Sequence, residues 1–160
     1  MQIFQTLLLV ALLAACGSNN PVNVQVWGGL GDAHGQFNEP FDVAVNKQGF
    51  VYVTDVRNKR VQKFSSNGDF ILTFGENLFE KPSGIAVASD ATVWVTDYDL
   101  DKVFHFDGQG KLIAAWGKAG DKQGEFESPV DVAVNAEGLV YVVDQYHHRI
   151  QVFSSDGRFI

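Results

Sequence analysis

The sequence has little sulfur: its 160 residues include one cysteine and one methionine. With Cys16 as the only cysteine, an intrachain disulfide is excluded. Cations are also scarce, because 12 lysines and arginines stand against 19 aspartates and glutamates, for a formal charge of −7. Nonspecific binding to a nucleic-acid backbone depends on clustered cations, so we expect no nucleic-acid partner.

The amino terminus is apolar but too short to cross a membrane. Residues 3–15 form an apolar run of 13 positions, whereas a membrane-spanning helix needs about 20. A run of this length that ends in small residues is typical of a secretion signal. The alternative is a buried apolar strand or helix with a chance cysteine.

The end of this run, Leu13-Ala14-Ala15-Cys16, resembles the bacterial lipobox. The resemblance implies cleavage after a signal peptide of residues 1–15 and acylation, including palmitate-type chains, at Cys16. No thiol then remains for catalysis or metal binding. Residues 16–22 would form an acylated tether, and Gly17 after the cysteine favours the outer membrane. We therefore expect an exported protein, lipid-anchored at the outer membrane or on the periplasmic side of the cell envelope.

Internal repeats dominate the rest of the chain. Three segments align without a gap, beginning at Pro40, Pro82 and Pro129, and each contains an apolar run that ends in aspartate. A third apolar run, a glycine-containing turn and a fourth run follow in each copy. The periods of 42 and 47 residues fall in the range of β-propeller blades, in which each repeat is a four-stranded antiparallel sheet.

The repeats predict an all-β fold with three blades, over residues 40–75, 82–117 and 129–160, the last one incomplete. Residues 23–28 match the fourth strands of the blades, so we expect them to form a closure strand in a propeller region of residues 23–160. The repeated aromatic residues Trp27, Phe74 and Trp116 are expected to pack between blades.

The repeat unit resembles the NHL repeat. The third copy, residues 144–153 (DQYHHRIQVF), is the nearest match, followed by residues 55–64, whereas the second copy has Leu100-Asp101-Lys102 in place of the Asn-x-Arg segment. Because NHL propellers usually have six blades, the resemblance implies part of a ring. We expect a chain truncated to about three blades, or half-rings that associate with each other.

The NHL resemblance implies a module that binds a protein or a small ligand. The alternative is a fragment of a metal-dependent peptidyl-α-hydroxyglycine amidating lyase, whose family carries a metal-binding histidine directly after a repeat proline. Here those positions hold Phe41, Ser83 and Val130. We therefore expect a binding module rather than an enzyme, with no catalytic residue, no metal site and no cofactor. Calcium or zinc is the alternative, which no motif of the sequence supports. RNA binding, known for other NHL proteins, conflicts with export and with the negative charge.

Two groups of residues are candidates for specific roles. Aspartates recur at the end of each second strand, and we expect a structural role in which each accepts turn hydrogen bonds and pairs with the basic residue five positions later. A ring of carboxylates that binds a cation is the alternative. These repeat positions are Asp55, Asp97, Asp144, Arg60, Lys102 and Arg149.

Partner contacts are expected at the hairpins between second and third strands, where the copies differ from one another. Exposed tyrosine and arginine are favoured at interfaces. The candidate contact residues are Arg57, Asn58, Tyr98, Asp101, Gln145, Tyr146 and His147.

Overall fold

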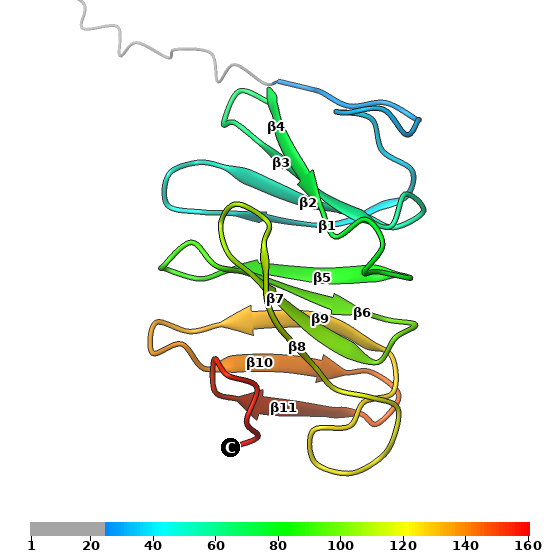
Figure 1. Cartoon of the computed structure of the whole chain (residues 1–160), viewed down its shortest axis with the longest axis vertical. Coiled ribbons are helices and arrows are strands. Elements are labelled where there is room, and N and C mark those ends of the chain that lie inside the picture. Colours follow the sequence, from blue (N-terminus) through cyan, green and yellow to red (C-terminus); the bar gives the residue numbers. More distant parts are fainter. Residues whose placement is uncertain (1–24) are drawn as a thin grey trace, which may run out of the picture.

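The computed structural model describes residues 25–160, which form eleven β-strands in three stacked antiparallel sheets (Figure 1). The predicted signal peptide, the tether, Cys16 and the first two residues of the expected closure strand lie outside the described residues. Valine, isoleucine and aromatic residues fill the strands because their side chains pack well on a pleated surface. The expected all-β blade architecture is confirmed.

Each sheet follows the chain order of its repeat. Blade 1 contains β1 (Pro40–Val45), β2 (Val51–Asp55), β3 (Arg60–Phe64) and β4 (Phe70–Phe74). Blade 2 contains β5 (Pro82–Val87), β6 (Val93–Asp97), β7 (Lys102–Phe106) and β8 (Leu112–Trp116). Blade 3 contains β9 (Pro129–Val134), β10 (Val140–Asp144) and β11 (Arg149–Phe153), and a Phe153–Phe159 bridge begins its fourth strand.

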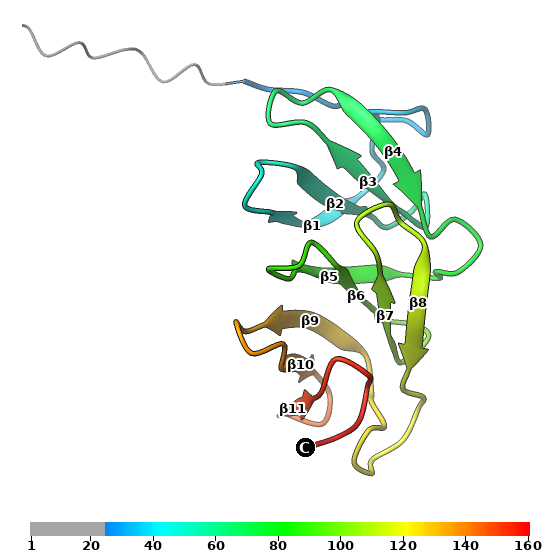
Figure 2. The ribbon, with the colours of Figure 1, turned by 60° about the vertical axis from the view of Figure 1, so that its left-hand side comes forward.

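The first strands of the blades stack on one another. β1 contacts β5, and β5 contacts β9, while β4 and β8 lie at the opposite edge (Figure 2). Hydrogen bonds join these inner strands, because Ile85 N donates to Asp42 Oδ2 at 2.9 Å and Ser83 Oγ donates to the Pro129 carbonyl at 3.0 Å. Farther out, Lys63 Nζ donates to the Gly108 carbonyl at 2.8 Å.

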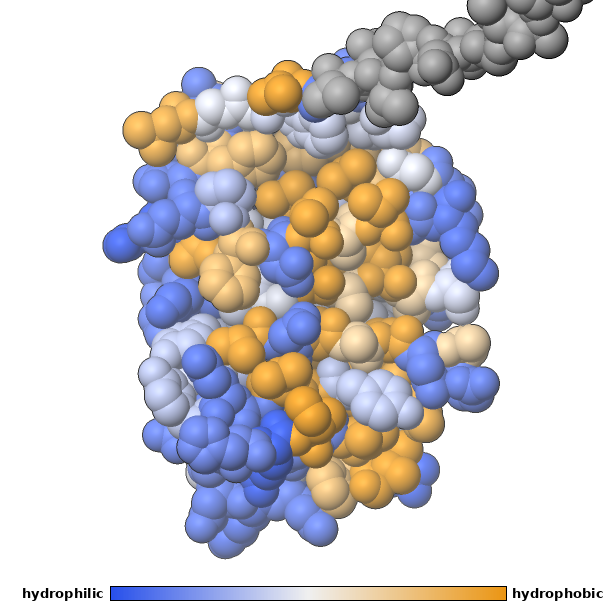
Figure 3. Space-filling model, turned by 180° about the vertical axis from the view of Figure 1, so that it is seen from behind, coloured by the Kyte–Doolittle hydropathy of each residue, from blue (hydrophilic) through white to orange (hydrophobic). Residues whose placement is uncertain are grey.

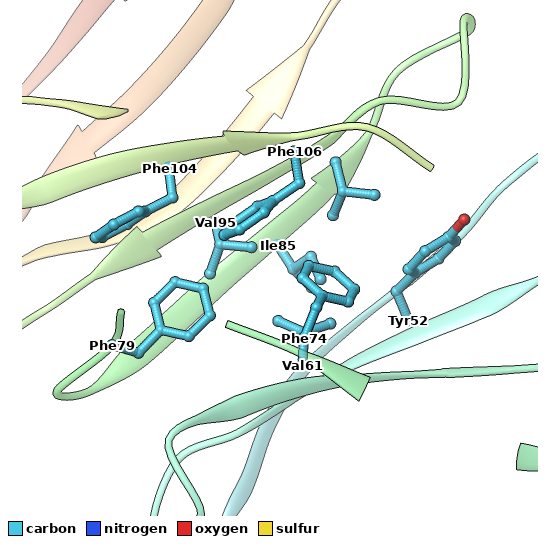
Figure 4. Packing of buried hydrophobic residues seen from close by; sticks show 9 residues of the cluster. Tyr52, Val61, Phe74, Phe79, Ile85, Val95, Phe104 and Phe106 are labelled. Carbon is cyan, nitrogen blue, oxygen red and sulfur yellow. The ribbon is translucent and has the colours of Figure 1, made fainter. Parts of the chain in front are cut away.

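The core lies between blades rather than within one of them. Between blades 1 and 2, Phe74 packs edge-on against Phe106, and Phe79 packs edge-on against Phe104 (Figure 4). A second cluster around Trp94, Val132 and Phe153 fills the space between blades 2 and 3. Each sheet is therefore apolar on both faces, which explains why its strands do not alternate between apolar and polar residues.

The closure strand stays a prediction, because it would pair with a last blade that is not among the described residues. Within the described chain, residues 25–29 form no strand. Trp27 is instead held by its ring, which packs against Phe64 and over Gly68. Trp116 packs over Gly157 in the same way, and Phe74 over Gly110, so the three aromatic residues occupy equivalent junctions as expected.

Candidate functional site

The site begins where the inner strands start and the hairpins between second and third strands converge. A hollow of about 690 Å³ opens there, which we call the hairpin-end hollow. Because β1, β5 and β9 start side by side, residues far apart in the sequence meet at this point. The lining residues are Glu39, Pro40, Phe41, Val56, Lys81, Pro82, Ser83, Tyr98, Val130 and Gln145.

The floor of the hairpin-end hollow is mostly apolar and differs from blade to blade. Phe41, Ser83 and Val130 each follow the first proline of their inner strand, yet the three side chains are chemically unlike. Phe41 is exposed, whereas Ser83 is buried and bonded to Thr96 and to the Pro129 carbonyl. The repeated backbone thus carries one asymmetric surface, which suits a single ligand better than three equal ones.

Two tyrosines and a lysine form part of the rim. The hydroxyls of Tyr98 and Tyr146 lie 3.0 Å apart, which links the hairpins of blades 2 and 3. Lys81 Nζ lies 3.9 Å from the centre of the Tyr98 ring, within the range of a cation–π interaction. Gln145 lines the same hollow. The rim therefore offers hydroxyl, amide and ammonium groups beside an apolar floor.

A charged groove of about 480 Å³ adjoins the hollow between blades 1 and 2. Arg57 Nε donates to Glu39 Oε2 at 2.7 Å, and Lys59 pairs with Glu80 across the groove. The hydrogen bond from Arg57 holds the pKa of Glu39 below its ordinary value. Because these pairs are exposed, water screens them and they add little to stability.

The predicted contact residues separate into two groups. Tyr98 and Gln145 line the hollow, Tyr146 is hydrogen-bonded to Tyr98 beside it, and Arg57 lies in the adjoining groove.

The side chains of the other three candidates, Asn58, Asp101 and His147, also bond within the protein, and a partner contact at these residues stays a prediction. Asn58 Nδ2 donates to Gly31 O and Asp55 Oδ2, and His147 Nδ1 lies 3.0 Å from Asp144 Oδ2. Asp101 Oδ1 accepts from Ser128 N. These bonds hold the loops beside the hairpins in place.

Sequence reasoning missed Phe41, Val130, Lys81 and Glu39 at the hollow. Two of them could have been found from the repeat alignment, because Phe41 and Val130 occupy the same position, directly after the first proline of blades 1 and 3. The rest are brought in by the link and hairpin geometry, which the repeat alignment alone does not predict.

The repeated aspartates are buried inside their own blades. Asp55 Oδ2 accepts from Arg60 Nε at 2.9 Å, and Asp144 Oδ2 accepts from Arg149 Nε at 2.8 Å. Both expected pairs are therefore present. Each carboxylate also accepts from the glutamine seven positions later, Gln62 or Gln151.

The pair expected between Asp97 and Lys102 is absent among the described ion pairs. Asp97 instead accepts hydrogen bonds from four backbone N–H groups, those of Glu80, Lys81, Asp99 and Leu100. Burial raises the pKa of Asp97, and these bonds oppose the shift only in part.

The pKa of Asp144 is shifted in the opposite direction to that of Asp97. Burial also raises the pKa of Asp144, but bonds from Glu127 N, Arg149 and His147 outweigh it and leave the pKa below its ordinary value. Each aspartate thus accepts several hydrogen bonds from its own blade and from the link before it, as the structural interpretation expects.

The histidines do not converge on one point. His34 stacks on Phe70, and His105 is buried against Trp94 with ring centres 3.6 Å apart. Burial lowers the pKa of His105, which keeps the ring neutral. Within residues 25–160, no three histidine, cysteine, aspartate or glutamate side chains group together in a way that could hold a metal ion.

The same described residues contain no helix with the length and apolar character needed to cross a bilayer.

Comparison with known proteins identifies the repeats. A family model described as "NHL repeat" matches residues 37–64 and 126–153, which lie in blades 1 and 3. The "B-box type zinc finger protein ncl-1" of Caenorhabditis elegans is 48% identical over 44 residues, which are 28% of this chain and 5% of that protein.

Solved structures show the same architecture. Virginiamycin B lyase from Staphylococcus aureus aligns with a TM-score of 0.63 and 15% identity, over 76% of this chain and 40% of that one. A chain of the nidogen/laminin complex aligns with a TM-score of 0.65 and 20% identity, over 79% of this chain and 48% of that one. This chain thus spans less than half of each relative, and at such identity the likeness shows the fold alone.

An NHL propeller fold supports a binding module or part of a propeller enzyme. Together, the repeat match, the antiparallel sheets and the stacked inner strands show that the chain carries NHL repeats in blades 1 and 3 and folds as part of a β-propeller.

Proposed function

We propose that this protein is a lipid-anchored NHL-repeat module of the bacterial cell envelope, and that it binds a protein or small ligand at the hairpin-end hollow. The observation that carries the proposal is the set of unlike side chains, Phe41, Ser83 and Val130, at one aligned position around a hollow of about 690 Å³. A volume of this size is typical of ligand sites.

The chemistry of the hollow favours a ligand with an apolar group and hydrogen-bonding edges. Phe41 and Val130 offer apolar surface, while Tyr98, Gln145 and Lys81 offer polar atoms at the rim. Tyrosine supplies both contact area and a hydroxyl at low cost in conformational entropy, which suits recognition of a peptide segment. The adjoining groove of paired charges can receive the polar remainder of such a segment.

Binding at the hollow can be tested with a panel of blocked tripeptides that carry phenylalanine, leucine or proline at the centre. We expect NMR shift changes gathered around Phe41 and Tyr98 during titration. The variants F41S and Y98A should weaken binding by about tenfold, which corresponds to about 1.4 kcal/mol. The matched control I113S removes an exposed apolar side chain from β8 and should leave binding unchanged. Shift changes spread evenly over the surface would contradict the site.

The anchor can be tested separately from the site. Cells fed an alkyne-labelled palmitate analogue should incorporate the label into the protein, and C16S should abolish both the label and the membrane association. Two or more acyl chains hold a protein on a membrane because each buried methylene contributes about 0.8 kcal/mol. An unlabelled wild-type protein that fractionates without membranes would refute the anchor and leave the hollow proposal standing.

A further inference from the structure

The hairpins between second and third strands touch, in blades 2 and 3, through two tyrosines. Tyr98 directly follows β6, and Tyr146 lies two residues after the end of β10. Their hydroxyls are 3.0 Å apart, and their ring centres are 6.4 Å apart with the ring planes at 72°. At the junction between blades 1 and 2, the equivalent residues are Val56 and Asp99. The repeated fold therefore does not require this contact.

Both rings are accessible to solvent at the ends of the strands. Tyr146 is 53% exposed, and Tyr98 is partly exposed. Figure 3 shows that hydrophilic side chains border the band of hydrophobic ones at both ends of the stacked strands. Of the other two tyrosines, Tyr52 is enclosed between blades 1 and 2, and Tyr141 lies within β10. The pair is thus the place in the described chain where two tyrosines meet and a dissolved reagent can reach them.

The surroundings of Tyr98 make its hydroxyl easier to deprotonate. The hydrogen bond with Tyr146 is the main cause of a lowered pKa at Tyr98, and the ammonium of Lys81, 3.9 Å from the ring centre, adds to the effect. The same hydrogen bond raises the pKa of Tyr146. Because a phenolate gives up an electron more readily than a phenol, Tyr98 is the ring of the pair that is oxidised first.

We propose that Tyr98 and Tyr146 form a site of oxidative cross-linking, at which hydrogen peroxide and a one-electron oxidising catalyst of the haem peroxidase type join the two rings as dityrosine. The product is a covalent brace between blades 2 and 3. It requires neither a ligand in the hairpin-end hollow nor a lipid anchor, so it is independent of the proposed function.

The oxidation removes one electron and the hydroxyl proton from each tyrosine. The two phenoxyl radicals then form one carbon–carbon bond between the ring carbons next to those that carry oxygen. Each of these carbons loses its hydrogen as a proton, and each oxygen takes up one proton, so both hydroxyls return. In total, two electrons and two protons leave the pair and reduce one hydrogen peroxide to two water molecules.

The hydrogen bond between the two hydroxyls favours coupling within one chain. It holds the two oxygens together, and because the reacting carbons lie beside these oxygens, their effective concentration is high. The ring centres, at 6.4 Å, must still approach each other for a bond to form. Tyr146 lies on a turn and is exposed, so its ring can rotate about its side-chain bonds without displacing the core.

The cross-link supplies a kind of brace that cysteine cannot supply here. Residues 25–160 contain no cysteine, so no disulfide can join their blades. Tyr98 and Tyr146 are 48 positions apart in the sequence, and a link that closes a loop of this length restricts the unfolded chain strongly. We therefore expect the link to stabilise the junction between blades 2 and 3.

The test exposes the full-length chain, in nonionic detergent and at low micromolar concentration, to hydrogen peroxide and a haem peroxidase. We expect dityrosine fluorescence, a single-chain species that has lost two hydrogen atoms, and a cross-linked pair of peptides that contains both residues. Y98F and Y146F should each lower the yield by about tenfold or more. The control Y141F removes a tyrosine hydroxyl from the same blade and should leave the yield unchanged.

Thermal denaturation measures the brace. We expect the cross-linked chain to unfold about 5 to 10 °C above Y146F treated in the same way, after subtraction of the difference between the untreated chains. Links found only between chains, an undiminished yield in Y98F or Y146F, or oxidation without dityrosine would overturn the proposal. An unchanged midpoint of unfolding in the cross-linked chain would overturn the brace.

Discussion

An aromatic residue of the preceding link packs on each blade, but only blades 1 and 3 also bind that link through an arginine and a glutamine of the third strand. In blade 1, Arg60 donates to the carbonyls of Asp32, Ala33 and Gln36, and Gln62 bonds Gln36 and Gly35. Arg149 and Gln151 repeat this arrangement in blade 3, with the carbonyls of Asp121, Lys122 and Glu125 and the N–H of Gly124.

Blade 2 has Lys102 and Phe104 at the same two positions, and Phe104 packs on Phe79 of its link. The difference follows link length. Pro40 and Pro129 each follow the aromatic residue of the preceding junction by 13 positions, whereas Pro82 follows Phe74 by only 8. A long link turns back and presents carbonyl groups that arginine and glutamine can bind; a short link has too few residues for this turn. The same fold thus closes its blade junctions in two ways.

The largest expected difference between the long-link blades and blade 2 is the loss of stability when the basic residue that begins the third strand is removed. R60A leaves Asp55 and three loop carbonyls without their buried donor, so we expect a loss of about 3 to 5 kcal/mol in the free energy of unfolding. R149A should cost about 1 to 3 kcal/mol because the Arg149 side chain is 30% exposed. K102A should change stability by about 0.5 kcal/mol or less. Urea denaturation measures all three, and an equal loss for K102A and R60A would break the comparison.

Replacing Phe104 of blade 2 by the glutamine that blades 1 and 3 have at this position should also destabilise the protein. F104Q loses the packing on Phe79 and buries an amide without a partner, at an expected cost of about 3 kcal/mol. The matched experiment repeats F104Q together with K102R in a chain whose residues 75–81 are replaced by a copy of residues 117–128. The longer link should recover a large part of the loss. No recovery would show that link length does not determine the residue type.

The smallest expected effect is a difference in pH dependence between two equivalent aspartates. The pKa of Asp144 is lowered in the fold, so its stabilising contribution is present above the unfolded pKa of about 3.9 and is lost as the pH falls through the native pKa. The pKa of Asp97 is raised, so its protonated form is favoured in the fold and stability falls as the pH rises from about 3.9 through the native pKa.

Denaturation at several acidic pH values can separate these opposite slopes. D144N should flatten the loss of stability toward low pH, while D97N should remove a loss that occurs as the pH rises. The comparison is made within each variant, because both substitutions also change hydrogen bonding at neutral pH. If the slope of stability against pH changes in the same direction in both variants, the native pKa values of the two carboxylates are not shifted in opposite directions.

The parts of the structure that depend on local pattern were predictable. Apolar runs and recurrent prolines predicted the strands, and the spacing of five residues predicted the pairs of Asp55 and Asp144 with arginine. The turn hydrogen bonds of Asp97 were predicted correctly, but its pair with Lys102 was wrong because spacing alone does not show which donors reach the carboxylate. The hairpin-end hollow was predicted only in part. Phe41 and Val130 both line it because the inner strands of the blades stack, and the repeat alignment does not show how the blades are arranged in space.

The tryptophans give the molecule built-in optical reporters of its junctions. Trp27 and Trp116 cover the glycine of the turn that follows the third strand in blades 1 and 3, while Phe74 covers the corresponding glycine of blade 2. The indole of Trp94 is fully enclosed and stacks on His105, an arrangement that favours quenching when the ring is protonated. Single-tryptophan variants would therefore emit from one blade boundary at a time, and the order in which their spectra shift during unfolding would give the order in which the blades separate.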